Sequence, residues 1–154
     1  MSKTNLDQFI KLFRSINQYD IDNALTFEIH DPGSITYKMT ISEKHLSSPN
    51  TAHGAVIAGF MDCVLGLSAL SEAVTHENLT STVEFKINYV RPVALGEEIT
   101  GTGKVVHKGK SLLISSGEVR NSKGDLIALG QGTFNTYPFS KKDFAHELTS
   151  TPRT

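Results

Sequence analysis

The longest apolar stretch of the sequence runs from Gly54 to Leu70 and holds an aspartate, Asp62, near its centre. A carboxylate buried without partners is costly, so this side chain requires a hydrogen-bonding partner or a wet cleft. Carboxylates in such positions serve as general bases and nucleophiles, which makes Asp62 the first candidate for chemistry. The alternative is a structural aspartate that is bonded to backbone amides or turned to solvent at a helix edge.

His53 and Gly54 stand at the head of the same stretch, where a loop gives way to an expected helix. Amide N–H groups in the first turn of a helix have no intrahelical acceptor, and the helix dipole makes this end positive. Because glycine lets a ligand approach the backbone closely, the Gly54 amide suits a developing oxyanion. A plain loop-to-helix junction, in which His53 only caps or packs, is the alternative.

The spacing between these candidates is more informative than either residue alone. Asp62 follows His53 by nine residues, which is about two and a half helical turns and roughly 12–14 Å along the axis. The two positions cannot act on one atom within a single subunit. Two helices that meet antiparallel across a two-fold axis would bring Gly54 of one chain to Asp62 of the other. The spacing is therefore compatible with a site at a homodimer interface, without demanding one.

Patterns in the rest of the sequence predict the elements that position this helix. Helical spacing of apolar residues predicts an N-terminal helix, and the apolar stretch predicts a buried one, over residues 6–16 and 54–74. Alternating patterns predict six strands, over residues 25–28, 35–41, 80–91, 98–107, 111–120 and 126–136. Residues 42–52 show no period and are expected to form a surface loop.

These elements predict an α+β fold in which one antiparallel sheet of five or six strands wraps around one long apolar helix, with an N-terminal helix added. A chain of 154 residues fits one domain, which we assign to residues 1–140, followed by a polar C-terminal tail over residues 141–154. An open sheet leaves two edges, so we expect pairing with a second copy, as a homodimer or homotetramer.

Composition narrows the partners and the compartment. A net charge of -1 argues against a nucleic-acid partner, and an aspartate in mid-helix argues against a membrane span. A single cysteine, Cys63, excludes an intramolecular disulfide, and the N-terminus lacks the shape of a signal peptide, so we expect a cytoplasmic protein. Six histidines without close metal-ligand spacing, and the lack of a phosphate-binding loop, predict neither a metal nor a cofactor.

The run from Thr51 to Asp62 resembles the His-Gly-Gly…Asp motif of the hotdog-fold thioesterases, in particular the PaaI-like group. Three later runs, over residues 82–96, 108–111 and 124–134, resemble strands that follow the helix in that family. The likeness extends in unbroken order from about residue 24 to residue 135. The resemblance implies the hotdog fold, a site shared by two subunits and an acyl-CoA thioesterase, which hydrolyses acyl-CoA to free acid and CoA.

The family's functional residues fall on matching positions of this chain. The resemblance implies that Asp62 is the general base or the nucleophile, and the sequence does not separate these roles. It implies that the Gly54 N–H donates to the thioester oxygen and that Thr82 orients the attacking water. By simple alternation along the strand, Thr82 faces the same side of the sheet as Glu84 and the opposite side to Phe85. Thr82 therefore reaches the site only if the Glu84 side of the strand faces the dimer interface.

Two departures from the family pattern fall at substrate-binding positions beside His53. The second glycine of the motif is Ala55, whose side chain can narrow the approach of the thioester. The asparagine expected six residues before the histidine is Ser47, and the nearest asparagine is Asn50. A hydroxyl donates one hydrogen bond where an amide donates two, so the departures bear on activity and substrate range.

The CoA nucleotide requires cationic partners near the mouth of the site, for which the candidates are Arg91, Lys108 and Lys110. Simple solvation of these side chains is the alternative. Two other functions stay open. One is an acyl-CoA-binding or sensing protein without turnover, which Ala55 and Ser47 favour. The other is a hotdog dehydratase, for which we find no catalytic His–carboxylate motif.

Overall fold

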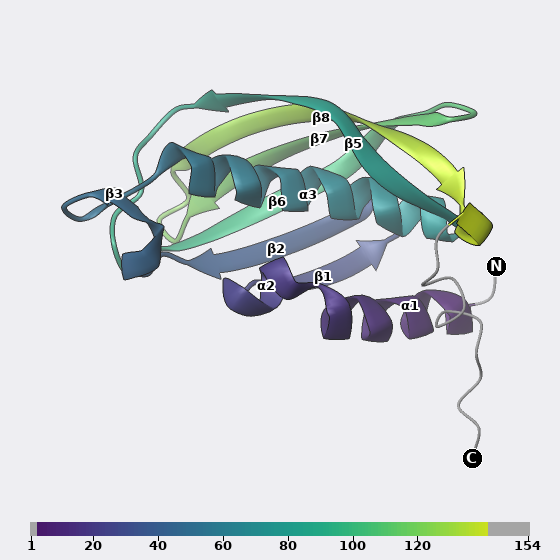
Figure 1. The fold of residues 1–154 in the computed structure, drawn as a ribbon. Coiled ribbons are helices and arrows are strands. Elements are labelled where there is room, and N and C mark those ends of the chain that lie inside the picture. The colour runs from purple at the N-terminus through teal and green to yellow at the C-terminus, as the bar shows by residue number, and fades with distance from the viewer. Residues whose placement is uncertain (1–2, 142–154) are drawn as a thin grey trace, which may run out of the picture.

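The computed structural model describes residues 3–141, which fold as one antiparallel sheet around one long helix (Figure 1). In spatial order the strands are β1 (Thr26–Asp31), β2 (Ser34–Thr40), β6 (Glu98–Lys108), β7 (Leu112–Asn121), β8 (Leu126–Pro138) and β5 (Asn78–Tyr89). Helix α3 (Gly54–Val74) lies against one face of this sheet. The six strands, the central helix and the N-terminal helix confirm the predicted α+β fold.

Helix α3 approaches the sheet closely at glycines of the inner strands. A methyl group at Gly101 or Gly103 of β6 would collide with Val64, and one at Gly130 of β8 would lie 2.6 Å from the Met61 sulfur. Because the strands carry no side chain at these points, the helix sits directly on the sheet and its side chains fill the core. By length and composition α3 would also suit a membrane span, but in this domain it is the core helix.

Two helices precede the sheet and lie beside α3. The predicted helix is α1 (Lys3–Ile16), in which Phe9 is buried against Val74 of α3 and Leu79 of β5. The next helix, α2 (Gln18–Asp22), was not predicted, because five residues are too few to show a helical period. Its first turn is capped by Asn17, whose side-chain oxygen accepts a hydrogen bond of 3.3 Å from the Asp20 amide.

The segment between β2 and α3 is more regular than the predicted loop. It contains a 3-10 turn, η1 (Glu43–His45), and two short strands, β3 (Leu46–Ser48) and β4 (Thr51–Ala52), which pair with each other. The prediction of an irregular loop over residues 42–52 was wrong in this respect, because strands of two or three residues are too short to show alternation. After β8 the described residues end with η2 (Phe139–Lys141), and the predicted tail over residues 141–154 lies outside them but for its first residue.

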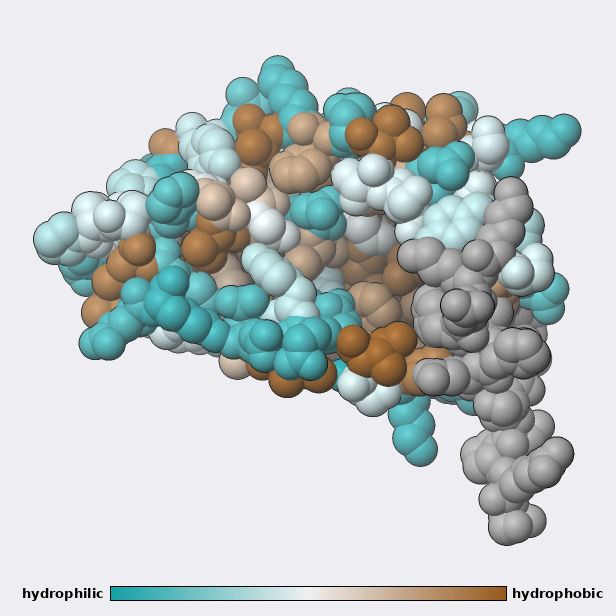
Figure 2. All heavy atoms as spheres, in the orientation of Figure 1, coloured by the Kyte–Doolittle hydropathy of each residue, from teal (hydrophilic) through white to brown (hydrophobic). Residues whose placement is uncertain are grey.

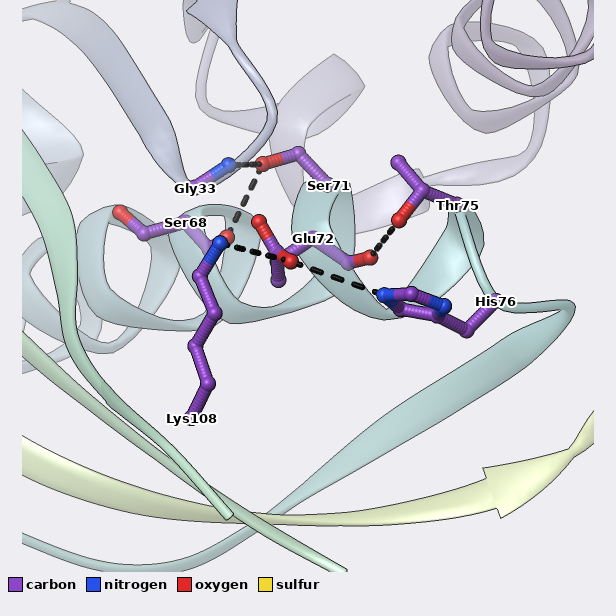
Figure 3. A network of polar contacts seen from close by, with 7 residues as sticks. All are labelled: Gly33, Ser68, Ser71, Glu72, Thr75, His76 and Lys108. Atoms are coloured by element: carbon purple, nitrogen blue, oxygen red, sulfur yellow. Dashed lines mark hydrogen bonds and ion pairs between the residues drawn. The ribbon is translucent and has the colours of Figure 1, made fainter. Parts of the chain in front are cut away.

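A cluster of polar side chains fixes the C-terminal end of α3 (Figure 3). Glu72 is only 6% exposed and contacts Lys108 Nζ of β6 at 2.9 Å, with His76 Nε2 at 3.8 Å. Beside it, the Ser71 hydroxyl accepts a hydrogen bond of 2.9 Å from the Gly33 amide in the β1–β2 turn. The helix is therefore tied to two separate parts of the sheet at this end.

Candidate active site

Asp62 and Thr82 come together from the middle of α3 and the first half of β5. The Thr82 hydroxyl donates a hydrogen bond of 3.0 Å to Asp62 Oδ1. Asp62 is half-buried and Thr82 is exposed. A carboxylate with a neutral donor on one oxygen keeps further lone pairs for a water or a substrate. Two residues predicted to share a site are thus in direct contact, while their catalytic roles stay predictions.

A β-bulge in β5 turns Thr82 toward the helix. Thr82 pairs with Phe134 of β8 and Phe85 pairs with Gly132, so β5 holds one extra residue between them. Residues directly opposite each other share a face of the sheet, and Phe134 is buried beside Gly66 of α3. Simple alternation predicted that Thr82 and Phe85 face opposite sides. That prediction was wrong, because the extra residue puts both on the side of the helix.

A pocket of about 220 Å³ opens beside the Asp62–Thr82 pair. Asn17, which links α1 to α2, adds a carboxamide to its polar wall. The apolar wall is formed by α1, α3 and β8 through Phe13, Leu67, Leu70 and Phe134. Asn17 and Phe13 were not predicted to line the site, because no local pattern in the sequence indicates that the N-terminal helix packs over the middle of α3.

Two further titratable side chains, Tyr37 and Cys63, line the pocket beside Asp62, and Tyr37 is hydrogen-bonded to a third, Asp20. The Tyr37 hydroxyl donates a hydrogen bond of 2.6 Å to Asp20, which is 5% exposed. Burial raises the pKa of the Asp20 carboxyl, although the hydrogen bond from Tyr37 opposes the shift. Burial also raises the pKa of the Cys63 thiol, and the nearby Asp20 and Asp62 carboxylates add to this effect. A neutral thiol is a weak nucleophile, so Cys63 does not compete with Asp62.

The N-terminal end of α3 carries the second half of the candidate site. His53 caps the helix, since its Nδ1 accepts a hydrogen bond of 2.8 Å from the Ala55 amide. Gly54 and Ala55 are both exposed. A methyl group at Gly54 would lie 3.7 Å from the Tyr89 ring, which is an ordinary contact. The fold therefore accepts alanine at position 54, and what glycine adds is room for a ligand at the backbone.

The two halves lie too far apart to act together within one subunit. Gly54 and Asp62 belong to one uninterrupted helix, and eight residues separate them by about 12 Å along its axis. Strand β5, which carries Thr82, forms one edge of the sheet, and Val83 and Tyr89 on it are more than half exposed. A long edge strand with apolar side chains is a template for pairing with a second copy. The shared site stays a prediction.

The positions that depart from the family pattern lie near the start of α3. Ser47 is exposed on β3. Asn50 takes a left-handed conformation, with φ of 64°, in the turn between β3 and β4, and its carbonyl accepts a hydrogen bond of 3.2 Å from the Leu95 amide. Asn50 therefore has a clear structural role in this turn, and substrate contact by either residue stays a prediction.

The three cationic candidates lie at opposite ends of α3. Arg91 follows β5 at the N-terminal end, where the Tyr89 hydroxyl donates to the Gly54 carbonyl at 3.0 Å. Lys108 contacts Glu72 at the C-terminal end, and Lys110 lies in the exposed β6–β7 turn. Within one subunit these side chains do not form a single patch. Among residues 3–141, no group of three or more His, Cys, Asp or Glu side chains is placed to hold a metal ion.

Known proteins share both the sequence pattern and the fold. The family model of the thioesterase superfamily matches residues 49–128. Human acyl-coenzyme A thioesterase 13 is 32% identical over 132 residues, which cover 84% of this chain and 92% of that protein. The solved structure of the PaaI protein from the Escherichia coli phenylacetic acid degradation operon has a TM-score of 0.79 at 19% identity, covering 87% of this chain and 94% of that one. A hypothetical thioesterase of Streptococcus pneumoniae, solved with coenzyme A, has a TM-score of 0.68 at 20% identity, covering 74% and 89%.

The chain therefore belongs to the thioesterase superfamily, whose hotdog fold it has. The matched region contains Gly54, Asp62 and Thr82. Within the superfamily the chain belongs with the acyl-coenzyme A thioesterase 13 and PaaI proteins, the PaaI-like group that the motif around Asp62 predicted.

Proposed function

We propose that the chain hydrolyses the thioester of acyl-CoA at a site to which two copies contribute. Asp62 and Thr82 of one subunit would face the Gly54 amide of the other across a two-fold axis. The observation that carries this proposal is the 3.0 Å hydrogen bond from Thr82 to Asp62, which holds a carboxylate at the wall of a largely apolar pocket. A homodimer is the smallest assembly that completes such a site.

The Gly54 amide would supply the electrophilic half of the reaction. Its N–H lies in the first turn of a helix of 21 residues, where amides lack intrahelical acceptors and the dipole favours negative charge. The thioester oxygen gains charge as the carbonyl carbon becomes tetrahedral, and a hydrogen bond from this N–H stabilises that charge. In other enzymes, losing one such donor costs about 10²–10³ in rate.

Asp62 would supply the nucleophilic half. As a general base it takes a proton from a water whose oxygen attacks the thioester carbon, after which the C–S bond breaks and the leaving thiolate is protonated. As a nucleophile it attacks the carbon itself, expels the thiolate and forms a mixed anhydride that water opens. In both routes the Thr82 hydroxyl orients the carboxylate, and its oxygen can accept a hydrogen bond from the water.

CoA would extend away from the reacting atoms toward cationic groups of both subunits. Antiparallel helices set the start of one α3 beside the middle of the other, so the C-terminal end with Lys108 lies about 15 Å further along. Arg91 of one subunit and Lys108 or Lys110 of the other would then flank the same entrance. The relative from Streptococcus pneumoniae, solved with coenzyme A, supports this class of ligand.

Release of free CoA thiol from a panel of acyl-CoA esters tests the activity. We expect the wild-type protein to cleave at least one ester and Asp62→Asn, which keeps the size of the side chain, to lose most of that rate while staying folded. Cleavage by Asp62→Asn at the wild-type rate would refute the role of Asp62. Binding of acyl-CoA without cleavage of any ester would favour a binding protein instead.

Mixing two inactive variants tests whether the site is shared. Asp62→Asn and Gly54→Val would be unfolded and refolded together, with different affinity tags to isolate the mixed dimers. If Gly54 of one chain faces Asp62 of the other, each mixed dimer holds one intact site, and random assembly restores about a quarter of the wild-type rate. Isolated mixed dimers without activity would refute the shared site.

A further inference from the structure

The pocket beside Asp62 continues under the N-terminal helix. A second pocket, of about 320 Å³, shares four lining residues with the first, Phe13, Asn17, Leu70 and Thr80. Its other walls are mainly apolar and come from α1, β5 and β8, through Phe9, Ile16, Leu79 and Tyr137. Figure 2 shows this face of the molecule hollowed over α3, with hydrophobic side chains in the hollow. The two pockets thus form one groove that starts at the catalytic pair.

One stripe of α3 forms the floor of this groove. Asp62, Gly66 and Leu70 follow one another at intervals of four residues, and all three line the first pocket. Gly66 carries no side chain, so the groove stays open one turn beyond the carboxylate. A methyl group there would lie 3.6 Å from the Phe134 ring, an ordinary contact, so packing on the sheet does not require this glycine. Glycine inside a helix costs about 1 kcal/mol relative to alanine, which indicates that position 66 is kept open for another reason.

Aromatic contacts hold the roof of the groove in place. Phe13 of α1 lines both pockets. Its ring stacks on Phe9 at 5.6 Å and meets the edge of Phe27 at 5.8 Å, measured between ring centroids. A ring fixed by two neighbours gives the groove a definite height. The space between Phe13 and the stripe of α3 therefore suits a slender apolar group better than a branched one.

We propose that this groove holds the acyl chain of the substrate, that Gly66 opens it and that α1 covers it. The inference rests on the proposed function, because it places the thioester carbon at Asp62. A chain that follows the stripe reaches Leu70 after about 12 Å. C–C bonds of about 1.5 Å zigzag in an extended chain and advance about 1.25 Å per carbon, so roughly ten carbons cover this length. The substrate class is therefore a straight-chain aliphatic acyl-CoA of medium length, and Gly66 and Phe13 determine specificity.

Values of kcat/KM for straight-chain esters from acetyl-CoA to palmitoyl-CoA test this inference. In the wild-type protein kcat/KM should rise by up to about fourfold per added methylene and level off near ten carbons. In Gly66→Leu the side chain fills the groove one turn from Asp62. The ratio of kcat/KM for decanoyl-CoA to that for butyryl-CoA should then fall at least about tenfold, since several methylenes lose their place.

Two further variants make the test decisive. Gly66→Ala should lower the ratio of kcat/KM for decanoyl-CoA to that for butyryl-CoA by a smaller factor. This variant replaces Gly66→Leu in the test if Gly66→Leu does not fold. Ser15→Leu adds an apolar side chain on the exposed side of α1 and should leave the ratio unchanged. A wild-type profile that does not rise with chain length, or a ratio unaffected by both substitutions at Gly66, would overturn the inference while leaving the hydrolase intact. No cleavage of any ester would overturn the proposed function itself.

Discussion

Helix α3 carries two carboxylates in contrasting surroundings. Glu72, near its C-terminal end, is 6% exposed and contacts Lys108 Nζ at 2.9 Å, with the His76 ring at 3.8 Å. Asp62 lies ten residues earlier, is half-buried and accepts a hydrogen bond from a neutral hydroxyl, that of Thr82. The first closes a polar cluster that ties the helix to the sheet, and the second borders an open pocket.

This contrast separates a carboxylate that holds the structure from one that is free to react. A direct contact with an ammonium group occupies lone pairs of a carboxylate and weakens it as a base and as a nucleophile. A neutral hydroxyl orients the group without neutralising it. The more buried carboxylate is therefore the structural one here, and burial alone does not identify the reactive group.

Neutralising Asp62 and Glu72 in separate variants should give the largest difference in kcat. Asp62→Asn should lower kcat for acyl-CoA cleavage on the order of 10²–10⁴-fold, because the group that activates the water is lost. Glu72→Gln removes the same charge from the same helix and should leave kcat near the wild-type value. Thiol release under saturating acyl-CoA measures both. A comparable loss of kcat in a folded Glu72→Gln variant would break the distinction.

Removing the neutral partner of Asp62 should have a smaller effect. Thr82→Val keeps the shape of the side chain and deletes the hydroxyl that orients the carboxylate. Hydrogen bonds to charged groups contribute about 1.5–3 kcal/mol, so kcat should fall roughly 10- to 100-fold. Thr82→Ser, which retains the hydroxyl, should recover most of the rate. Full activity in Thr82→Val would mean that Asp62 requires no orienting donor.

A third carboxylate, Asp20, sharpens the comparison, because it is buried and accepts a hydrogen bond from a neutral hydroxyl, that of Tyr37. Its folded-state pKa is raised by burial, so its contribution to stability is complete below the unfolded pKa and is lost as pH rises through the folded pKa. Asp20→Asn removes the ionisation and keeps an oxygen for the Tyr37 hydroxyl. Between about pH 4 and pH 7 the variant should gain about 1 kcal/mol relative to wild type, measured by urea unfolding. A difference in unfolding free energy that stays constant across this pH range would contradict the raised pKa of Asp20.

The smallest effect should be the loss of folding stability when the charge of Glu72 is removed. Lys108 is 59% exposed at its side chain, so its ion pair with Glu72 is largely screened by water. Glu72→Gln should cost about 1 kcal/mol or less, which corresponds to a decrease in Tm of about 2–4 °C. Differential scanning fluorimetry at low and high salt measures it, and the loss should shrink at high salt. A larger, salt-independent loss would show that the cluster acts through packing.

Long periodic segments were predicted well, and short or irregular ones were not. Helix α3 begins at Gly54 and ends at Val74 as expected, because twenty-one apolar-rich residues leave few alternatives. Helix α2, the β3–β4 pair and the bulge in β5 were missed, since each involves five residues or fewer. In the candidate site, Asp62 and Gly54 were singled out by residue type and position, and their catalytic roles stay predictions. Thr82 followed from the family resemblance, because alternation alone assigned it to the wrong face.

The bulge in β5 absorbs one residue without changing the partners of its neighbours on β8. Deleting Val83 would leave Thr82 opposite Phe134 and Phe85 opposite Gly132, because Glu84 alone would then lie between them. Uniform alternation would return, and the Thr82 hydroxyl would still face Asp62, because Thr82 would keep its partner on β8. Among relatives of this chain, a one-residue gap at this position is therefore compatible with an intact Asp62–Thr82 pair, whereas a gap in a regular part of β5 would turn the side chains on one side of it to the other face.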